Sequence, residues 1–168
     1  MNTAFERNQQ REEWLTPKWL IDALAPFDLD PCASVVRPWP TAKQHYTIQD
    51  NGLLKPWAGF TYCNPPYGRQ TSKWLRRMAE HNNGIALTFA RTETAQFFES
   101  VWTKASCVVF IRSRLIFVDT DGKPALNKDG RPQGAGAPSV LIGYGPEGFR
   151  RLMSRDIPGR FVNLWPRM

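Results

Sequence analysis

Gly59-Phe60-Thr61-Tyr62-Cys63-Asn64-Pro65-Pro66-Tyr67-Gly68 is a short apolar run that ends abruptly at two prolines. Its β-favouring residues 60–63 predict a buried central strand. Pro65 and Pro66 cannot donate to a strand ladder, so the strand must end at Asn64. Because a residue before a proline is held extended, Asn64 and Pro65 should form a stiff lip directly after the strand.

The groups on this lip suit one chemical task. Asn64 offers a side-chain carbonyl, Pro65 a backbone carbonyl without an N–H, and Tyr67 a flat aromatic face. Two acceptors that take both N–H bonds of a nucleobase amine direct its lone pair at an electrophile, and Tyr67 can stack on an extruded base. Asn64, Pro65, Pro66 and Tyr67 are therefore the predicted catalytic group. For the tetrapeptide alone, a rigid turn is the alternative interpretation.

The lip is one of several sequence blocks that occur in a characteristic order. The blocks are Trp14-Leu15-Thr16-Pro17, Phe27-Asp28-Leu29-Asp30-Pro31-Cys32-Ala33-Ser34, Gly52-Leu53-Leu54-Lys55-Pro56-Trp57, Tyr62-Cys63-Asn64-Pro65-Pro66-Tyr67-Gly68, Arg114-Leu115-Ile116-Phe117 and Pro138-Ser139-Val140-Leu141. With these blocks, the sequence resembles the phage-type DNA N-6-adenine methyltransferase (Dam) family of amino-group methyltransferases. Asn/Asp/Ser-Pro-Pro-Tyr/Phe/Trp is the signature of those enzymes.

The resemblance implies a fold, a reaction and a cofactor. The expected fold is a single three-layer α/β domain of the class I, Rossmann-like methyltransferase type, with a mostly parallel sheet and an antiparallel strand near the C-terminus. The implied reaction transfers a methyl group from S-adenosylmethionine to N6 of a flipped adenine in DNA. Methylation of cytosine N4 or of RNA adenine is an alternative. Because the glycine-rich Rossmann fingerprint is absent, a catalytically inactive, basic nucleic-acid-binding protein is another.

Cofactor contacts are expected from three segments. Thr16-Pro17 predicts a helix start with a hydroxyl cap and proline at the first position, and the resemblance implies that it approaches the methionine carboxylate. An ordinary capped helix explains the pair equally well. Asp30 lies at the end of a predicted strand at 27–31, where open α/β sheets bind ligands, and the resemblance implies cofactor contacts for Asp30, Pro31 and Ala33. The resemblance also implies that Asp50 faces the adenine amine of the cofactor, although an acidic residue before a turn is common.

Hydrophobic periodicity predicts the remaining elements. A helix is expected from 17 to about 25, another begins at Thr71 or Ser72 and runs to about 80, and a helical stripe follows residue 94. Strands are predicted at about 45–47, 84–90, 107–111 and 139–145, with a helix at 146–153 and an edge segment at 161–165. No internal repeat is evident.

DNA contacts are expected from basic residues near the lip and from a long loop. Arg69 follows the lip, Arg112 and Arg114 flank an apolar run, and Phe117 is predicted to wall the base pocket opposite Tyr67. The segment at about 119–138 is rich in Gly, Pro, Lys and Arg and predicts a loop or hairpin. DNA contact is the preferred hypothesis for it, and disorder is the alternative.

Composition limits the remaining possibilities. The chain has 168 residues and a formal charge of +7, which suits a polyanionic partner or simply a basic surface. Three widely spaced cysteines show neither a metal-ligand nor a disulfide pattern, so we expect no metal and a cytoplasmic protein. The resemblance implies a bacterial host cell and suggests phage or prophage origin. No membrane segment is evident, and the oligomeric state cannot be predicted. Residues 1–12 are expected to be flexible, and 13–168 to form the methyltransferase domain.

Overall fold

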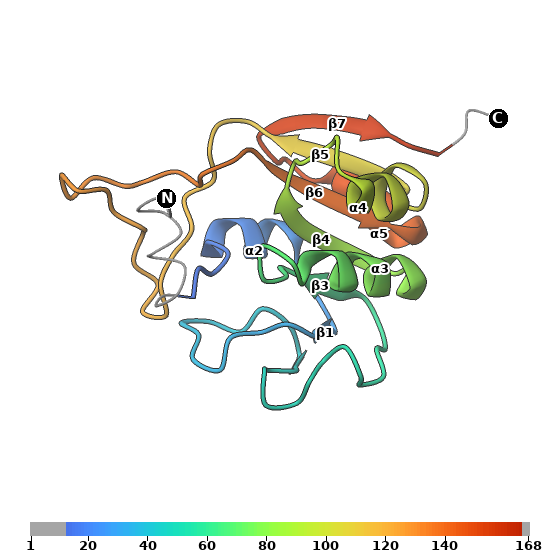
Figure 1. Ribbon diagram of the computed structural model, residues 1–168, viewed down its shortest axis with the longest axis horizontal. Helices are drawn as coiled ribbons and strands as arrows, with labels where there is room; N and C mark the ends of the chain where they lie inside the picture. The colour runs from blue at the N-terminus through green and yellow to red at the C-terminus, as the bar shows by residue number, and fades with distance from the viewer. Residues whose placement is uncertain (1–12, 166–168) are drawn as a thin grey trace.

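The computed structural model describes residues 13–165, so the segment predicted to be flexible, 1–12, lies outside the described residues. These residues form a mixed α/β fold built on a seven-stranded sheet (Figure 1). Its strands are β1 Leu29–Asp30, β2 Gln44–His45, β3 Thr61–Cys63, β4 Gly84–Phe89, β5 Cys107–Ile111, β6 Ser139–Tyr144 and β7 Gly159–Asn163. The helices are α2 Lys18–Leu24, α3 Thr71–His81, α4 Ala95–Phe97, which continues as a π-helical turn η1 Phe98–Trp102, and α5 Gly145–Ser154.

The strand order β2-β1-β3-β4-β6-β5-β7 creates a break in the winding of the sheet. From β1 the chain moves to β2 on one side, and it later returns to place β3 on the other side of β1. The chain segments that leave the carboxyl ends of β1 and β3 therefore lead toward opposite edges of the sheet. A crevice forms between them, outside the carboxyl ends of these two strands. The predicted lip follows β3, so it lies at this crevice.

The sheet is mostly parallel, as predicted. Strands β1 to β5 point the same way, whereas β6 and β7 run antiparallel to β5. Two strands near the C-terminal end are therefore antiparallel to the rest, where one was predicted. The second is β7, which overlaps the predicted edge segment and pairs with β5 along its whole length. The predicted strands at 84–90, 107–111 and 139–145 are confirmed to within a residue. The predicted strand at 45–47 begins one residue earlier and ends at His45.

Helices cover both faces of the sheet. One apolar cluster packs α2 and α5 against alternate residues of the strands, including Tyr62, Ile85 and Leu87. A second cluster packs α3 and η1 against the intervening residues, including Cys63 and Ala86. Because successive strand residues face opposite sides, β3 and β4 are buried on both faces.

Two helix starts differ from the prediction. Pro17 is the N-cap of α2, and no side chain caps that helix, so the expected Thr16 cap is wrong. The Thr16 hydroxyl is instead buried against Tyr62, which local capping rules cannot foresee. The first residue before α3 is Gln70, and the hydroxyl of Thr71 donates to the Pro66 carbonyl rather than to its own helix, at 2.7 Å.

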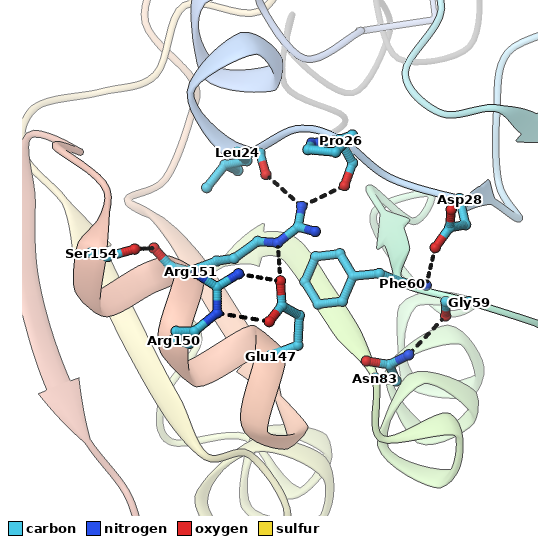
Figure 2. Close-up of polar contacts among 10 residues, drawn as sticks. All are labelled: Leu24, Pro26, Asp28, Gly59, Phe60, Asn83, Glu147, Arg150, Arg151 and Ser154. Carbon is cyan, nitrogen blue, oxygen red and sulfur yellow. Dashed lines mark hydrogen bonds and ion pairs between the residues drawn. The ribbon is translucent and has the colours of Figure 1, made fainter.

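Arg151 of α5 ties the end of α2 to the start of β3 (Figure 2). Its Nη1 donates to the backbone carbonyls of Leu24, at 3.1 Å, and Pro26, while Nε donates to Glu147 at 2.6 Å. The guanidinium lies 4.0 Å from the ring centroid of Phe60, the residue before β3. A single buried cation therefore fixes the position of the strand that carries the lip.

Within residues 13–165, no helix is long and apolar enough to cross a bilayer. The same part of the chain holds no cluster of three or more His, Cys, Asp or Glu side chains arranged for a metal ion.

Candidate active site

A cavity of about 620 Å³ opens at the carboxyl ends of β1 and β3. Residues 13–16, 30–34 and 64–67 supply most of its lining, and the loop at 37–52 supplies one further wall. Its volume lies within the range of small-molecule sites in proteins. The cavity thus occupies the crevice that the strand order creates.

The Asn64 amide is held with its carbonyl oxygen unpaired. Asn64 Nδ2 donates to Thr16 Oγ1 at 3.3 Å, and the Thr16 and Tyr62 hydroxyl oxygens share a hydrogen bond at 2.6 Å. Asn64 Oδ1 is buried and has no hydrogen-bond partner among residues 13–165. A buried carbonyl oxygen without a donor is costly, so this atom is suited to accept from a ligand N–H.

The two prolines of the lip use their carbonyls differently. Pro66 O accepts from the hydroxyl of Thr71, which anchors the lip to the first turn of α3. Pro65 is buried at the cavity, and no described residue donates to its carbonyl. Asn64 and Pro65 therefore offer two adjacent acceptors at the cavity.

Tyr67 lies against a firm aromatic support. Its ring stacks on Phe89 with the centroids 4.1 Å apart and the planes 10° apart, and the edge of Phe117 packs at 6.1 Å. Burial raises the pKa of the Tyr67 phenol, so the phenol remains protonated. Its hydroxyl is buried and finds no partner within the described part of the chain, and Tyr67 is one of the residues that line the cavity. This hydroxyl is a second polar group available to a ligand.

Asp30 brings a buried carboxylate to the same cavity. Burial raises its pKa to about 6, against the effects of hydrogen bonds from the Thr41 hydroxyl and the Cys32 N–H and of the Arg37 charge. The ordinary value is 3.8, so the native state resists ionisation of this group. Strongly perturbed carboxylates in cavities are typical of functional sites.

The sign of this pKa shift gives a testable dependence of stability on pH. Because the folded pKa exceeds the unfolded one, the native state binds the extra proton between about pH 4 and 6, and stability declines as the pH rises through that window. Asp30→Asn removes the ionisation. We expect the variant to gain roughly 1–3 kcal/mol over wild type at pH 7.5 and little at pH 4. Urea unfolding at both pH values measures this gain, and an equal difference at the two would contradict it.

The cysteines near the cavity are not activated nucleophiles. Burial raises the pKa of Cys32 and of Cys63, and the negative charge of Asp30 acts in the same direction. A thiol in such surroundings stays protonated, and the thiolate is the reactive form. The site therefore offers acceptors and an aromatic face rather than a covalent nucleophile.

A glycine allows the two loops at the cavity to meet. A side chain at Gly52 would place its Cβ 1.9 Å from the Pro31 carbonyl oxygen. The Gly52 carbonyl also accepts from Trp57 Nε1 at 2.8 Å, which holds this close approach. Any larger residue at position 52 would push the loop away from the segment that carries Asp30.

The structure brings most of the predicted site residues together. All four lip residues line the cavity, as do Thr16, Asp30, Pro31 and Ala33. Pro17 does not, and the Asp50 carboxylate is exposed, where it accepts from the backbone N–H and the hydroxyl of Thr47. Phe117 is buried behind Tyr67 rather than in the lining, and the exposed arginines Arg69, Arg112 and Arg114 lie outside it.

Several lining residues were not predicted from the sequence. Tyr62 reaches the cavity through its hydroxyl, and Thr41 reaches it by donating to Asp30. Trp39 and Ile48 belong to the irregular segments between β1 and β3, where no sequence pattern predicts the path of the backbone. An apolar side chain as exposed as Ile48, at 87%, is one signal of a ligand wall, but it needs the structure to be seen.

Comparisons with known proteins identify the family of the chain. A family model described as DNA N-6-adenine-methyltransferase (Dam) matches residues 4–140, which include every residue that lines the cavity. No curated protein and no solved structure gives a match to the chain. The match spans most of the sequence, and the resemblance first carried by the Asn-Pro-Pro-Tyr lip is confirmed. The chain belongs to the DNA N-6-adenine-methyltransferase (Dam) family.

Proposed function

We propose that this chain transfers a methyl group from S-adenosylmethionine to the N6 amine of an adenine extruded from DNA into the cavity. The observation that carries the proposal is the pair of free acceptors, the buried Asn64 Oδ1 and the Pro65 carbonyl. An amine N–H on each would satisfy both, and an adenine N6 amine has two N–H bonds.

The chemistry follows from these acceptors. The lone pair of N6 is delocalised into the purine ring, so the amine is a poor nucleophile. When Asn64 Oδ1 and the Pro65 carbonyl accept its two N–H bonds, they favour a tetrahedral nitrogen and stabilise the positive charge that develops there. S-adenosylmethionine supplies an electrophilic methyl group when it is bound. The methyl–sulfur bond would break as the C–N bond forms, so that S-adenosylhomocysteine leaves, and the methylated amine would lose one proton to solvent.

Stacking on Tyr67 keeps the adenine in reach. Phe89 occupies one face of the Tyr67 ring at 4.1 Å and Phe117 fixes its edge, so the ring cannot swing away from the cavity. A base within a duplex is inaccessible and must be extruded before it can stack there. A supported ring offers a stacking surface with little entropy to lose.

The residues around the cavity suit the proposed cofactor. Ile48 offers an apolar surface for an adenosyl ring, and Asp30 and the hydroxyl of Thr41 offer polar groups for hydroxyls or an ammonium. Pro31 and Ala33 add a backbone segment that passes close to any ligand there. The volume exceeds what one base needs, which supports occupancy by both a cofactor and a base. We place the cofactor against Asp30, Pro31 and Ala33, and assign Thr16, which accepts from Asn64 Nδ2, to orienting the lip.

The sheet supports assignment to the class I, Rossmann-like methyltransferases. The cavity lies where connections diverge at the carboxyl ends of parallel strands, which is where such folds bind nucleotide cofactors. The Asp30-Pro31-Cys32-Ala33-Ser34 segment replaces the usual glycine-rich turn at that position. The exposed Arg69, Arg112 and Arg114 are our candidates for phosphate contacts.

Analysis of the product tests the proposal. Purified protein, methyl-labelled S-adenosylmethionine and duplex DNA should yield N6-methyladenine after digestion to nucleosides. Labelled N4-methylcytosine alone, or transfer to RNA but not to DNA, would overturn the assignment of substrate. Tight DNA binding without any cofactor binding would identify a basic binding protein instead.

Thr16→Val tests whether Thr16 orients the Asn64 amide. Valine keeps the shape of threonine but offers no oxygen to Asn64 Nδ2 or to the Tyr62 hydroxyl. We expect kcat to fall roughly tenfold, since one lost hydrogen bond is worth about 1 kcal/mol, with the KM for the cofactor nearly unchanged. Thr16→Ser is the matched control and should restore most of kcat. A raised cofactor KM at wild-type kcat would instead assign Thr16 to cofactor binding.

A further inference from the structure

The excursion between β5 and β6 contains a tandem repeat that the sequence analysis did not identify. Asp119-Thr120-Asp121-Gly122-Lys123-Pro124 and Asn127-Lys128-Asp129-Gly130-Arg131-Pro132 follow one pattern at eight-residue spacing. Asp, Gly and Pro recur unchanged at the third, fourth and sixth positions, while Asp119 is matched by Asn127 and Lys123 by Arg131. We call residues 118–133 the double turn.

The two units adopt the same conformation. Asp119 Oδ1 accepts from the N–H groups of Asp121 and Lys123 at 2.9 Å, and Asn127 Oδ1 accepts from the corresponding residues of the second unit at 2.9 Å. The glycines have φ of 80° and 73°, a conformation that favours glycine. The double turn is therefore preorganised, and binding through it costs little ordering entropy.

The double turn is attached to the rim of the cavity. Val118 exchanges two backbone hydrogen bonds with Leu15, at 2.8 and 2.9 Å, and a Cβ on Gly122 would meet the Trp39 ring at 2.8 Å. Leu15 and Trp39 both line the cavity. The second unit is exposed throughout, a Cβ on Gly130 would meet nothing within 4 Å, and the segment projects from the body at the left of Figure 1, in orange.

The charges of the double turn distinguish it from a phosphate clamp. It carries three cations and three carboxylates, so it contributes nothing to the formal charge of +7. Within residues 13–165, none of the six forms an ion pair. A segment that binds phosphates has an excess of cations, whereas base edges present donors and acceptors side by side. The charged groups are Lys123, Lys128, Arg131, Asp119, Asp121 and Asp129.

We propose that the double turn reads the base pairs next to the target adenine, with Asp129 and Arg131 of the second unit as its foremost contacts. A carboxylate accepts from the cytosine amine and a guanidinium donates to guanine, so each side chain can select a base. The first unit holds the second at a fixed position relative to the cavity. This inference rests on the proposed function, because it assumes duplex DNA at the cavity.

The test compares the sequence context of methylation. Asp129→Ala and Arg131→Ala leave the residues that hold the turn, Asn127 and Gly130, unchanged. Wild type and variants methylate plasmid DNA, and every N6-methyladenine is mapped with its neighbours. At the preferred sequence we expect the rate to fall roughly tenfold to a hundredfold, with weaker loss elsewhere, as for one lost contact to a base edge. Lys104→Ala and Glu80→Ala, exposed and before the amino ends of β5 and β4, are matched controls and should behave as wild type.

Three results would overturn the inference. Variants with unchanged context and rate would show that the double turn does not read DNA. Equal loss at all sequences with a shallower salt dependence would identify phosphate contacts alone. If wild-type protein methylates adenines equally whatever their neighbouring bases, there is no sequence preference for the double turn to determine.

Failure of the proposed function is recognised separately, as absence of N6-methyladenine from the wild-type reaction. In that case, competition among duplexes for the inactive Asn64→Ala protein still tests the double turn. The preference for particular duplexes should be lost in the double-turn variants, and its persistence would overturn the inference.

Discussion

Asn64→Ala should reduce kcat by about 100- to 1000-fold while the dissociation constant for S-adenosylmethionine changes less than about threefold. The expected loss is that of removing one preorganised acceptor from a developing charge, an interaction stronger in the transition state than in the ground state. Asn64 Oδ1 is buried and accepts no hydrogen bond within the described structure, so its removal leaves no buried donor without an acceptor there. Single-turnover methylation together with cofactor titration separates the two effects.

The control for this experiment keeps an acceptor at position 64. Asn64→Asp retains side-chain oxygens but cannot donate to Thr16, so it should keep more activity than Asn64→Ala. Asn163→Ala changes an exposed asparagine of β7 and should behave as wild type. Turnover of Asn64→Ala within tenfold of wild type would remove Asn64 from the reaction.

Arg151→Ala should destabilise the fold by about 2–4 kcal/mol. The guanidinium is about 10% exposed, and its loss leaves the carbonyls of Leu24 and Pro26 without their donor and removes the cation packed on Phe60. Buried acceptors left without a donor are expensive, and the ion pair with Glu147, whose side chain is 33% exposed, adds a smaller loss. Urea unfolding followed by circular dichroism measures the change in the free energy of unfolding.

The neighbouring arginine is the matched control. Arg150 also donates to Glu147, but its side chain is about 60% exposed and it reaches no backbone carbonyl of α2. Arg150→Ala should therefore cost much less than Arg151→Ala, because solvent screens an exposed ion pair. Similar losses for the two variants would mean that the contact with Glu147, rather than the ties to α2 and Phe60, explains the effect of Arg151.

Much of the sheet could be predicted because its strands are continuous apolar runs. Residues 84–89, 107–111 and 139–144 are buried on both faces, so their sequences contain the signal. The strand before the lip was predicted from Pro65 and Pro66, which act locally. β1 and β2 have two residues each, which is too few for a hydrophobic pattern. The helix expected after residue 94 consists of one α-helical turn, α4, followed by the π-helical turn η1.

The site was predictable where one residue carries the chemistry and not where distant residues meet. Asn64 and Tyr67 follow from the lip itself. The roles of Thr16 and Tyr62 depend on a contact between residues far apart in sequence, and capping rules assigned Thr16 to the wrong partner. Thr41 reaches Asp30 through a loop whose path has no periodicity. The tandem repeat was missed because its units are only six residues long and are identical only at the Asp, Gly and Pro positions.

The strand order also has a consequence for protein synthesis. Every residue that lines the cavity belongs to the part of the chain up to Trp74, yet β4, which borders β3, pairs along its full length with β6, and β6 begins at Ser139. On the ribosome the reactive groups emerge early, while the strand that completes their support emerges late. The cavity should therefore reach its native shape only after β6 has left the exit tunnel.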